Sequence, residues 1–204
     1  MRKRRFLRAI AISGLLVSSV VFLSGCFDKK PSFVSIDVTG ADYARDFQLP
    51  DQDGKSRSIK DFAGKIVVVF FGFTQCPDVC PTTMTELVEI RKALGKDGER
   101  VQAVFITVDP DRDSAEVLKA YLGNFDPSFV ALRPNSPEQL ATLAKDYKVY
   151  YKKVEGRTAT SYTMDHSAGS YVYDTRGQLR LYTRYGTGVK PLTEDIRQLL
   201  KQAS

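Results

Sequence analysis

Two cysteines, Cys76 and Cys80, stand four residues apart and are the side chains best suited to carry chemistry. An apolar run leads into them within residues 70–81, and each cysteine is followed directly by a proline. The chain has one histidine, His166, far along the sequence. Two thiolates and one imidazole are donors that soft metal ions prefer, and two nearby thiols can also cycle through a disulfide. We therefore expect a metal or redox site.

The spacing of the cysteines separates three interpretations. The first is that the two cysteines lie near each other in the core by chance, which is disfavoured because the loop around them is polar and rich in proline. A dithiol oxidoreductase usually has CxxC, whereas this pair is CxxxC, and the chain has no tryptophan to precede the first cysteine. A peroxidatic cysteine of the PxxxTxxC type needs threonine three residues earlier, where Phe73 and Pro77 stand instead. Metal binding is therefore favoured.

His166 is expected to complete the site. It lies in the polar run Asp165-His166-Ser167, which we interpret as a loop before a strand of the same sheet as residues 66–71. Two thiolates and one imidazole do not fill the closed set of four ligands that structural zinc requires. They suit copper, trigonal as Cu(I) and with a further donor as Cu(II). Asp165 is expected either to hold the imidazole from behind or to be solvated.

The elements around the cysteines can be predicted from their patterns. Residues 66–71 form an unbroken β-branched and aromatic run, which predicts a central strand covered on both faces. Helical spacing of apolar residues follows from about residue 81 to Leu94. A helix that begins near Val79 places Cys76 in the preceding loop and Cys80 in the first turn, where the helix N-terminus favours a thiolate.

The rest of the chain alternates strands and helices. Asp53-Gly54 predicts the tip of a hairpin between residues 47–49 and 55–59, and residues 101–108 predict a second buried strand. Asp113 and Glu116 have the form of a capping box for a helix through residues 118–121. Further elements are expected as a strand at 129–132, a helix opened by Ser136, Pro137 and Gln139, an edge strand at 147–154, a hairpin of 170–173 with 178–183, and a closing helix at 192–202. The order predicts an α/β fold with a mixed sheet flanked by helices.

The first 25 residues have the parts of an export signal. Five of the 30 basic residues and none of the 24 acidic ones lie there, followed by an apolar stretch and the sequence Leu-Ser-Gly-Cys ending at Cys26. This end resembles a bacterial lipobox, which predicts a signal peptide over residues 1–25, acylation of Cys26, a tether over 26–42 and a folded domain over 43–204. An uncleaved signal anchor is the alternative. We expect a lipid-anchored protein in the bacterial cell envelope, on the periplasmic or extracytoplasmic face of a membrane.

Without those 25 residues the chain is almost neutral, which excludes a basic nucleic-acid footprint. With Cys26 acylated, Cys76 and Cys80 are the only free thiols left, and one close pair is not a disulfide framework.

Three segments together resemble the Sco/SenC family: FTQCPDVCP at residues 73–81, VDPDRD at 108–113, and Asp165-His166. The resemblance implies a thioredoxin-like fold, copper binding and a role in assembling the binuclear copper centre of cytochrome c oxidase. It implies that Cys76, Cys80 and His166 are the copper ligands. It also implies that Asp109 lies near the site, although a strand end followed by a helix cap explains that loop equally well. Many members have a transmembrane helix where this chain has a lipobox.

Two functions remain open. The first is a copper chaperone rather than an enzyme, which receives copper from an upstream donor and passes it to the copper-site subunit of the oxidase. The second is a specialised thiol-disulfide reductase, in which Cys76 and Cys80 form a redox disulfide and keep the subunit's cysteines reduced. No proline occurs between Gly156 and Lys190, so the cis-proline beside a thioredoxin dithiol has no counterpart. A copper or redox sensor is a third reading.

Overall fold

A computed structural model describes residues 32–158 and 161–202. One compact unit begins at Phe33 and contains all the elements described below. The predicted signal peptide and the predicted acylation site Cys26 lie outside the described residues. Among the described helices, none has the length and apolar character that a membrane span requires.

The core of the unit is a mixed sheet of six strands built around β4 (Ile66–Gly72). Every residue of β4 is buried, as its unbroken apolar sequence predicts for a strand covered on both faces. β5 (Val101–Thr107) and β6 (Val130–Leu132) continue the sheet in parallel on one side. β9 (Ser170–Tyr173), β10 (Leu179–Thr183) and β1 (Ile36–Asp37) continue it in antiparallel pairs on the other. The predicted mixed sheet is confirmed.

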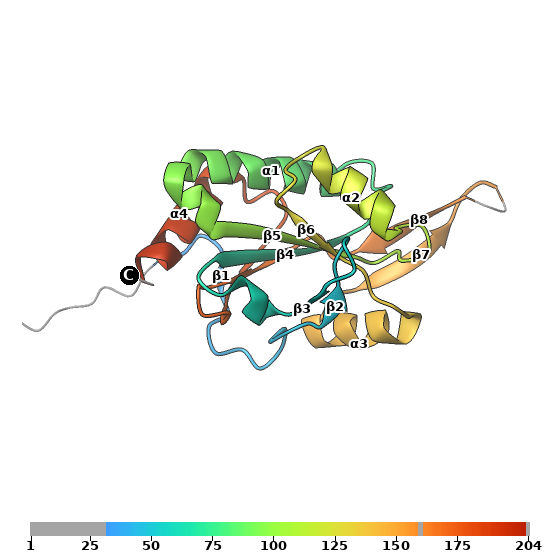
Figure 1. Ribbon diagram of the computed structural model, residues 1–204, viewed down its shortest axis with the longest axis horizontal. Coiled ribbons are helices and arrows are strands. Elements are labelled where there is room, and N and C mark those ends of the chain that lie inside the picture. The colour runs from blue at the N-terminus through green and yellow to red at the C-terminus, as the bar shows by residue number, and fades with distance from the viewer. Residues whose placement is uncertain (1–31, 159–160, 203–204) are drawn as a thin grey trace, which may run out of the picture. The chain divides into compact units, whose positions relative to one another are not determined.

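Helices cover both faces of this sheet (Figure 1). α1 (Val79–Leu94) and α2 (Ala115–Gly123) lie on one side, and α3 (Pro137–Tyr147) lies on the other. α4 (Val189–Lys201) packs against α1 and begins three residues before the predicted closing helix. Short 3-10 turns, η1 (Ile59–Phe62) and η2 (Gly95–Arg100), precede β4 and β5.

Local signals placed most of these elements correctly. The Ser136 hydroxyl accepts a hydrogen bond from the backbone N–H of Gln139, as a helix cap should. The hairpin of β2 (Leu49–Pro50) and β3 (Ser56–Arg57) turns at Asp53-Gly54 as predicted, although it pairs outside the main sheet. β9 and β10 form the predicted C-terminal hairpin.

The predicted capping box of α2 is wrong by one residue. Ser114, not Asp113, is the N-cap, and its hydroxyl accepts from the backbone N–H of Val117. Asp113 is fully buried and bonded to other partners. Asp and Ser are both good caps, so the local pattern did not distinguish them. The competing tertiary bonds of Asp113 decide which of the two caps the helix.

The segment that carries His166 differs most from expectation. β7 (Tyr151–Glu155) and β8 (Tyr162–His166) form a separate antiparallel ribbon, which extends to the right in Figure 1. The predicted edge strand at 147–154 therefore does not join the main sheet. His166 is the last residue of β8 rather than part of a loop. A short polar strand with one buried position carries too little hydrophobic signal to be recognised alone.

The compact unit begins earlier than the predicted tether allowed. β1 pairs with β10 at Ile36, and the preceding backbone N–H groups of Val34 and Ser35 both donate to the carboxylate of Asp195 on α4, at 2.9 and 2.8 Å. Asp195 is fully buried. Residues 33–42 therefore belong to the folded unit rather than to a tether.

Replacing Asp195 should loosen this attachment. Asp195→Ala leaves the donors at Val34 and Ser35 without their acceptor, so we expect the free energy of unfolding to fall by about 1–3 kcal/mol. Chemical denaturation measures this change. Glu194→Ala is the matched control on the same helix, because Glu194 pairs with Arg197 at the surface and should cost less than about 1 kcal/mol. Equal losses in the two variants would contradict the role assigned to Asp195.

Candidate metal centre

Residues 73–78 form the loop that carries Cys76, here called the cysteine loop. It leaves the carboxyl end of β4 and enters α1. The backbone N–H of Cys76 donates to the carbonyl of Phe73, which curls the loop. α1 begins at Val79 after the cap residue Asp78, so Cys80 lies in the first turn as predicted. The backbone N–H of Cys80 points to the Cys76 sulfur at 3.4 Å. One backbone N–H of the first helical turn is thereby directed at a thiol.

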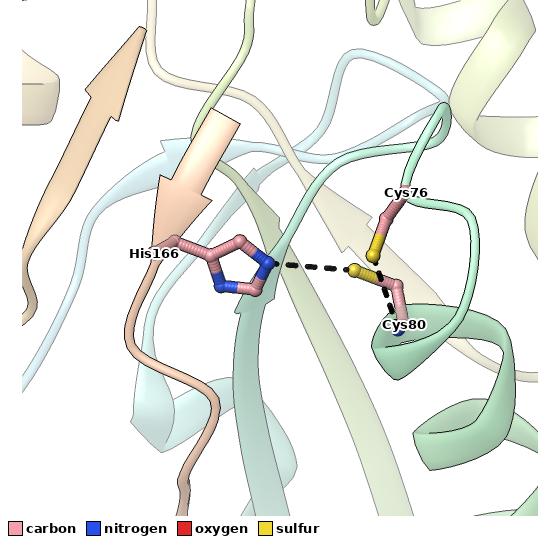
Figure 2. Close-up of side chains that lie close together, drawn as sticks. All are labelled: Cys76, Cys80 and His166. Atoms are coloured by element: carbon pink, nitrogen blue, oxygen red, sulfur yellow. Dashed lines mark hydrogen bonds between the residues drawn. The ribbon is translucent and has the colours of Figure 1, made fainter. Parts of the chain in front are cut away.

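β8 brings His166 to the same place. Its Nε2 lies 3.7 Å from the Cys80 sulfur, and the donor atoms of Cys76, Cys80 and His166 all lie within 4.8 Å of one another (Figure 2). Three ligands placed trigonally at metal bonds of about 2.2 Å would be about 3.8 Å apart. The residues predicted from the sequence are therefore brought together at a separation that fits one metal ion.

The orientation of His166 determines which nitrogen is free. Its Nδ1 lies 2.9 Å from the carbonyl oxygen of Ser167. A carbonyl oxygen can only accept, so Nδ1 carries the proton and the lone pair of Nε2 faces the sulfurs. Burial lowers the pKa of His166, against smaller opposite effects of the Ser167 carbonyl and Asp165. The imidazole is thus neutral at pH 7 and has its ligating nitrogen directed inward.

The partner behind the imidazole is a backbone carbonyl and not Asp165. We expected Asp165 either to hold the ring or to be solvated; its side chain is exposed, and the Ser167 carbonyl occupies the position beside Nδ1. Backbone carbonyls serve ligating histidines as well as carboxylates do. No pattern of side chains could have indicated this partner, because it belongs to the main chain.

Aromatic rings and a glycine shape the space around the donors. The rings of Phe70 and Phe73 meet the His166 ring edge-on, with centroids 6.0 and 5.8 Å away. A Cβ on Gly72 would come within 2.9 Å of the Cys80 sulfur and of the Phe105 ring. Only glycine at the end of β4 therefore leaves room for Cys80, a requirement that the sequence analysis did not identify.

The two thiols differ in their surroundings. Cys80 is fully buried, whereas Cys76 is partly exposed. Burial raises the pKa of the Cys80 thiol well above its usual range, and the neighbouring Cys76 thiol adds to the effect. In the metal-free protein desolvation outweighs the helix N-terminus at Cys80 and favours the thiol, whereas the helix N–H of Cys80 points to the sulfur of Cys76. A metal ion must displace the proton of the Cys80 thiol to bind the sulfur.

Asp113 anchors the cysteine loop. Its carboxylate accepts from the backbone N–H and the hydroxyl of Thr74, which begins the loop, and from the hydroxyl of Thr107 at the end of β5. Burial raises the pKa of Asp113, and these hydrogen bonds oppose that rise. Sequence reasoning missed this role because it assigned Asp113 to a helix cap. Asp109, which the family resemblance places near the site, accepts hydrogen bonds from Nε of Arg112 and from the Tyr162 hydroxyl.

The difference between the thiols can be tested by alkylation. At pH 7 in the reduced, metal-free protein we expect iodoacetamide to modify Cys76 and to spare Cys80, since only an accessible thiolate reacts. Peptide mass spectrometry measures the two yields. A moderately higher pH should still spare Cys80 in the folded protein, because burial raises the pKa of its thiol far above the usual range and shields the sulfur from the reagent. In denaturant both should react, and equal labelling of the folded protein would refute the assignment.

Comparisons with known proteins agree with this geometry. The family model described as SCO1/SenC matches residues 37–201. The SCO2-like protein of Rickettsia felis is 35% identical over 153 residues, which are 74% of each chain. The structure of Bradyrhizobium japonicum ScoI with copper bound is 40% identical, with a TM-score of 0.68 over 76% of this chain and 98% of that one. The copper-bound structure of Arabidopsis thaliana ScoI is 32% identical, with a TM-score of 0.71 over 77% and 97%.

The family model covers most of the chain, and the solved relatives share its thioredoxin-like arrangement of a mixed sheet between helices. The match extends from β1 to the end of α4 and includes the loop, the strand and the helix that carry the three donors. The chain therefore belongs to the SCO1/SenC family.

Proposed function

We propose that this protein binds copper through Cys76, Cys80 and His166 and assists assembly of the binuclear copper centre of cytochrome c oxidase. The observation that carries the proposal is the convergence of two sulfurs and a neutral Nε2 within 4.8 Å. Two relatives at 40% and 32% identity are solved with copper bound, which supports copper as the metal.

The donor set favours copper over structural zinc. The group found among the described histidine, cysteine and acidic side chains has three members, whereas structural zinc sites are closed by four. Two soft sulfurs and one imidazole suit a trigonal Cu(I) ion, and Cu(II) would add a further donor. A site that is satisfied by three ligands can also accept an incoming fourth.

Such a site suits transfer of copper to a partner. Cys76 and His166 are partly exposed, while Cys80 is fully buried. An incoming thiolate of the oxidase copper-site subunit would therefore replace Cys76 before the buried Cys80, and the ion would pass by ligand exchange. An upstream copper donor would load the site by the reverse exchange. Acylation of Cys26 would hold the protein on the periplasmic or extracytoplasmic face of a bacterial membrane, where it could meet its membrane-bound target.

A thiol-disulfide reductase is the second candidate, and the proximity of the two free thiols favours it. In that function Cys76 attacks a disulfide of the subunit, and Cys80 then resolves the mixed disulfide. The subunit's disulfide gains two electrons and two protons, and this chain is left with a Cys76–Cys80 disulfide. A separate thiol reductant would restore the dithiol.

His166→Ala tests the three-ligand site. We expect the affinity for Cu(I) to fall by more than about 100-fold, beyond the effect that partners outside the ligand set produce. Competition with a copper chelator measures it, while thiol titration should show that Cys76 and Cys80 still form a disulfide. Asp165→Ala is the matched control and should bind copper nearly as the wild type does, because the Ser167 carbonyl holds the ring. Unchanged affinity in His166→Ala would refute the ligand set.

Deleting the gene distinguishes the two candidate functions. If the protein delivers copper, added copper should restore oxidase assembly in the deletion strain, measured by oxidase activity and copper content. If it reduces the subunit's cysteines, only an added thiol reductant should restore assembly. Rescue by the reductant alone would therefore replace the delivery proposal with the second candidate.

A further inference from the structure

Arg112 contacts both segments that carry the proposed ligands. It lies in the loop between β5 and α2, and its side chain is mostly buried, with 20% exposed. Its Nη1 donates to the side-chain oxygen of Gln75 at 3.0 Å and to the carbonyl of Tyr162 at 2.9 Å. Gln75 precedes Cys76 directly, and Tyr162 begins the strand that ends at His166. One guanidinium thus joins the cysteine loop to the histidine strand.

The same guanidinium stacks between aromatic rings. Its central carbon lies 3.6 Å from the centroid of the Tyr162 ring and 5.8 Å from that of Phe73. Phe73 in turn meets the ring of His166 edge-on. Arg112 therefore contacts the histidine strand by hydrogen bonding and by stacking, and it also contacts a ring that packs against His166.

Asp109 holds Arg112 in this orientation. One carboxylate oxygen of Asp109 accepts from Nε of Arg112 at 2.5 Å, and the other accepts from the Tyr162 hydroxyl at 2.9 Å. Asp109 is almost fully buried, and its backbone N–H donates to Thr107 at the end of β5. Each of the side chains of Asp109, Arg112 and Tyr162 therefore contacts the other two, and Asp109 attaches this cluster to the central sheet.

The position of β8 depends on such contacts. In the described part of the chain, the ladder hydrogen bonds of β8 go to β7 alone, so no main-sheet ladder sets its distance from β4 and α1. At the His166 end, Ser167 and Tyr150 exchange hydrogen bonds within the same ribbon. From His166 the chain continues through residues 167–169 into Ser170 of β9, which pairs with Phe70 of β4 and ties that end of the ribbon to the sheet. At the Tyr162 end the described residues form no ladder with the main sheet, and there Arg112 makes the side-chain contacts that hold β8.

We propose that Arg112 is a positioning residue, which sets the place of His166 relative to Cys76 and Cys80 and so determines whether the third ligand reaches the metal. The inference rests on the copper site proposed above. Arg112 does not touch the donors in this role and acts on copper only through His166. Its planar fork is required, because a lysine ammonium carries the charge but cannot bond Gln75, Tyr162 and Asp109 in one plane.

Cu(I) affinity in the full chain tests this dependence, with a chelator as competitor. We expect Arg112→Gln and Arg112→Lys each to bind Cu(I) about 10–100-fold more weakly than the wild type. The double variant Arg112→Gln/His166→Ala should bind no more weakly than His166→Ala alone, because residues that act as a unit are not additive. Additive losses, or full affinity in Arg112→Lys, would overturn the proposal.

Arg91→Gln is the matched control. Arg91 lies towards the end of α1 opposite Cys80 and is buried to the same degree as Arg112, with 19% exposed. It pairs with Asp126 at 2.6 Å and stacks on Phe129 at 5.7 Å, and its hydrogen bonds go to Gly98, Asp126 and Ser128 rather than to the cysteine loop or β8. Its loss should lower stability without weakening Cu(I) binding in the protein that remains folded. An equal loss of affinity in Arg91→Gln would show that Arg112 acts through general stability, which would overturn the proposal.

A measurement without copper separates this inference from the proposed function. Amide hydrogen exchange of the metal-free protein should rise in residues 162–167 of Arg112→Gln and stay unchanged in Arg91→Gln. If the wild type fails to bind Cu(I) but exchange rises as expected, the copper function fails and the positioning role stands. Unchanged exchange in residues 162–167 would overturn the positioning role whatever the copper result.

Discussion

The buried carboxylate of Asp113 connects the cysteine loop to the central sheet. It accepts three hydrogen bonds from Thr74 and Thr107, which follow β4 and end β5. Burying a carboxylate is costly unless its acceptor positions are filled, so this cluster tolerates few alternative arrangements. The loop therefore leaves the sheet in one direction, and Cys76 meets the N-terminus of α1. The hydrogen bonds of Asp113 thus help to fix where the two thiols lie.

Charge and apolar surface are separated around the candidate centre. The ion pair of Asp109 and Arg112 lies to one side and attaches the ribbon, while Phe70 and Phe73 surround the imidazole. The donors themselves are a neutral imidazole, a protonated buried thiol and a partly exposed thiol. A metal ion that enters supplies the charge that the buried sulfur lacks, at the cost of releasing its proton. An apolar surround of this kind favours a soft ion held by few ligands over a strongly hydrated one.

Prediction from sequence succeeded where a short segment carries its own signal. The unbroken apolar run of β4, the Ser136 cap and the turn at Asp53-Gly54 all depend on neighbours within a few residues. It failed where distant partners compete. Asp113 has the form of a cap, but the threonines at positions 74 and 107 bind it instead. β8 was interpreted as a loop, because its ladder and its burial depend on β7 and on side chains elsewhere in the fold.

The sequence by itself determined the donor set, since thiol spacing, a single histidine and the motifs around them are properties of the chain order. It also determined the α/β class, because hydrophobic periodicity reflects which faces can be buried. Only the tertiary structure decided that Nε2 of His166 faces Cys80, that the Ser167 carbonyl selects the tautomer, and that Gly72 leaves room for the sulfur. These features depend on backbone atoms and on contacts across 86 residues of sequence, and residue types alone do not encode such distances.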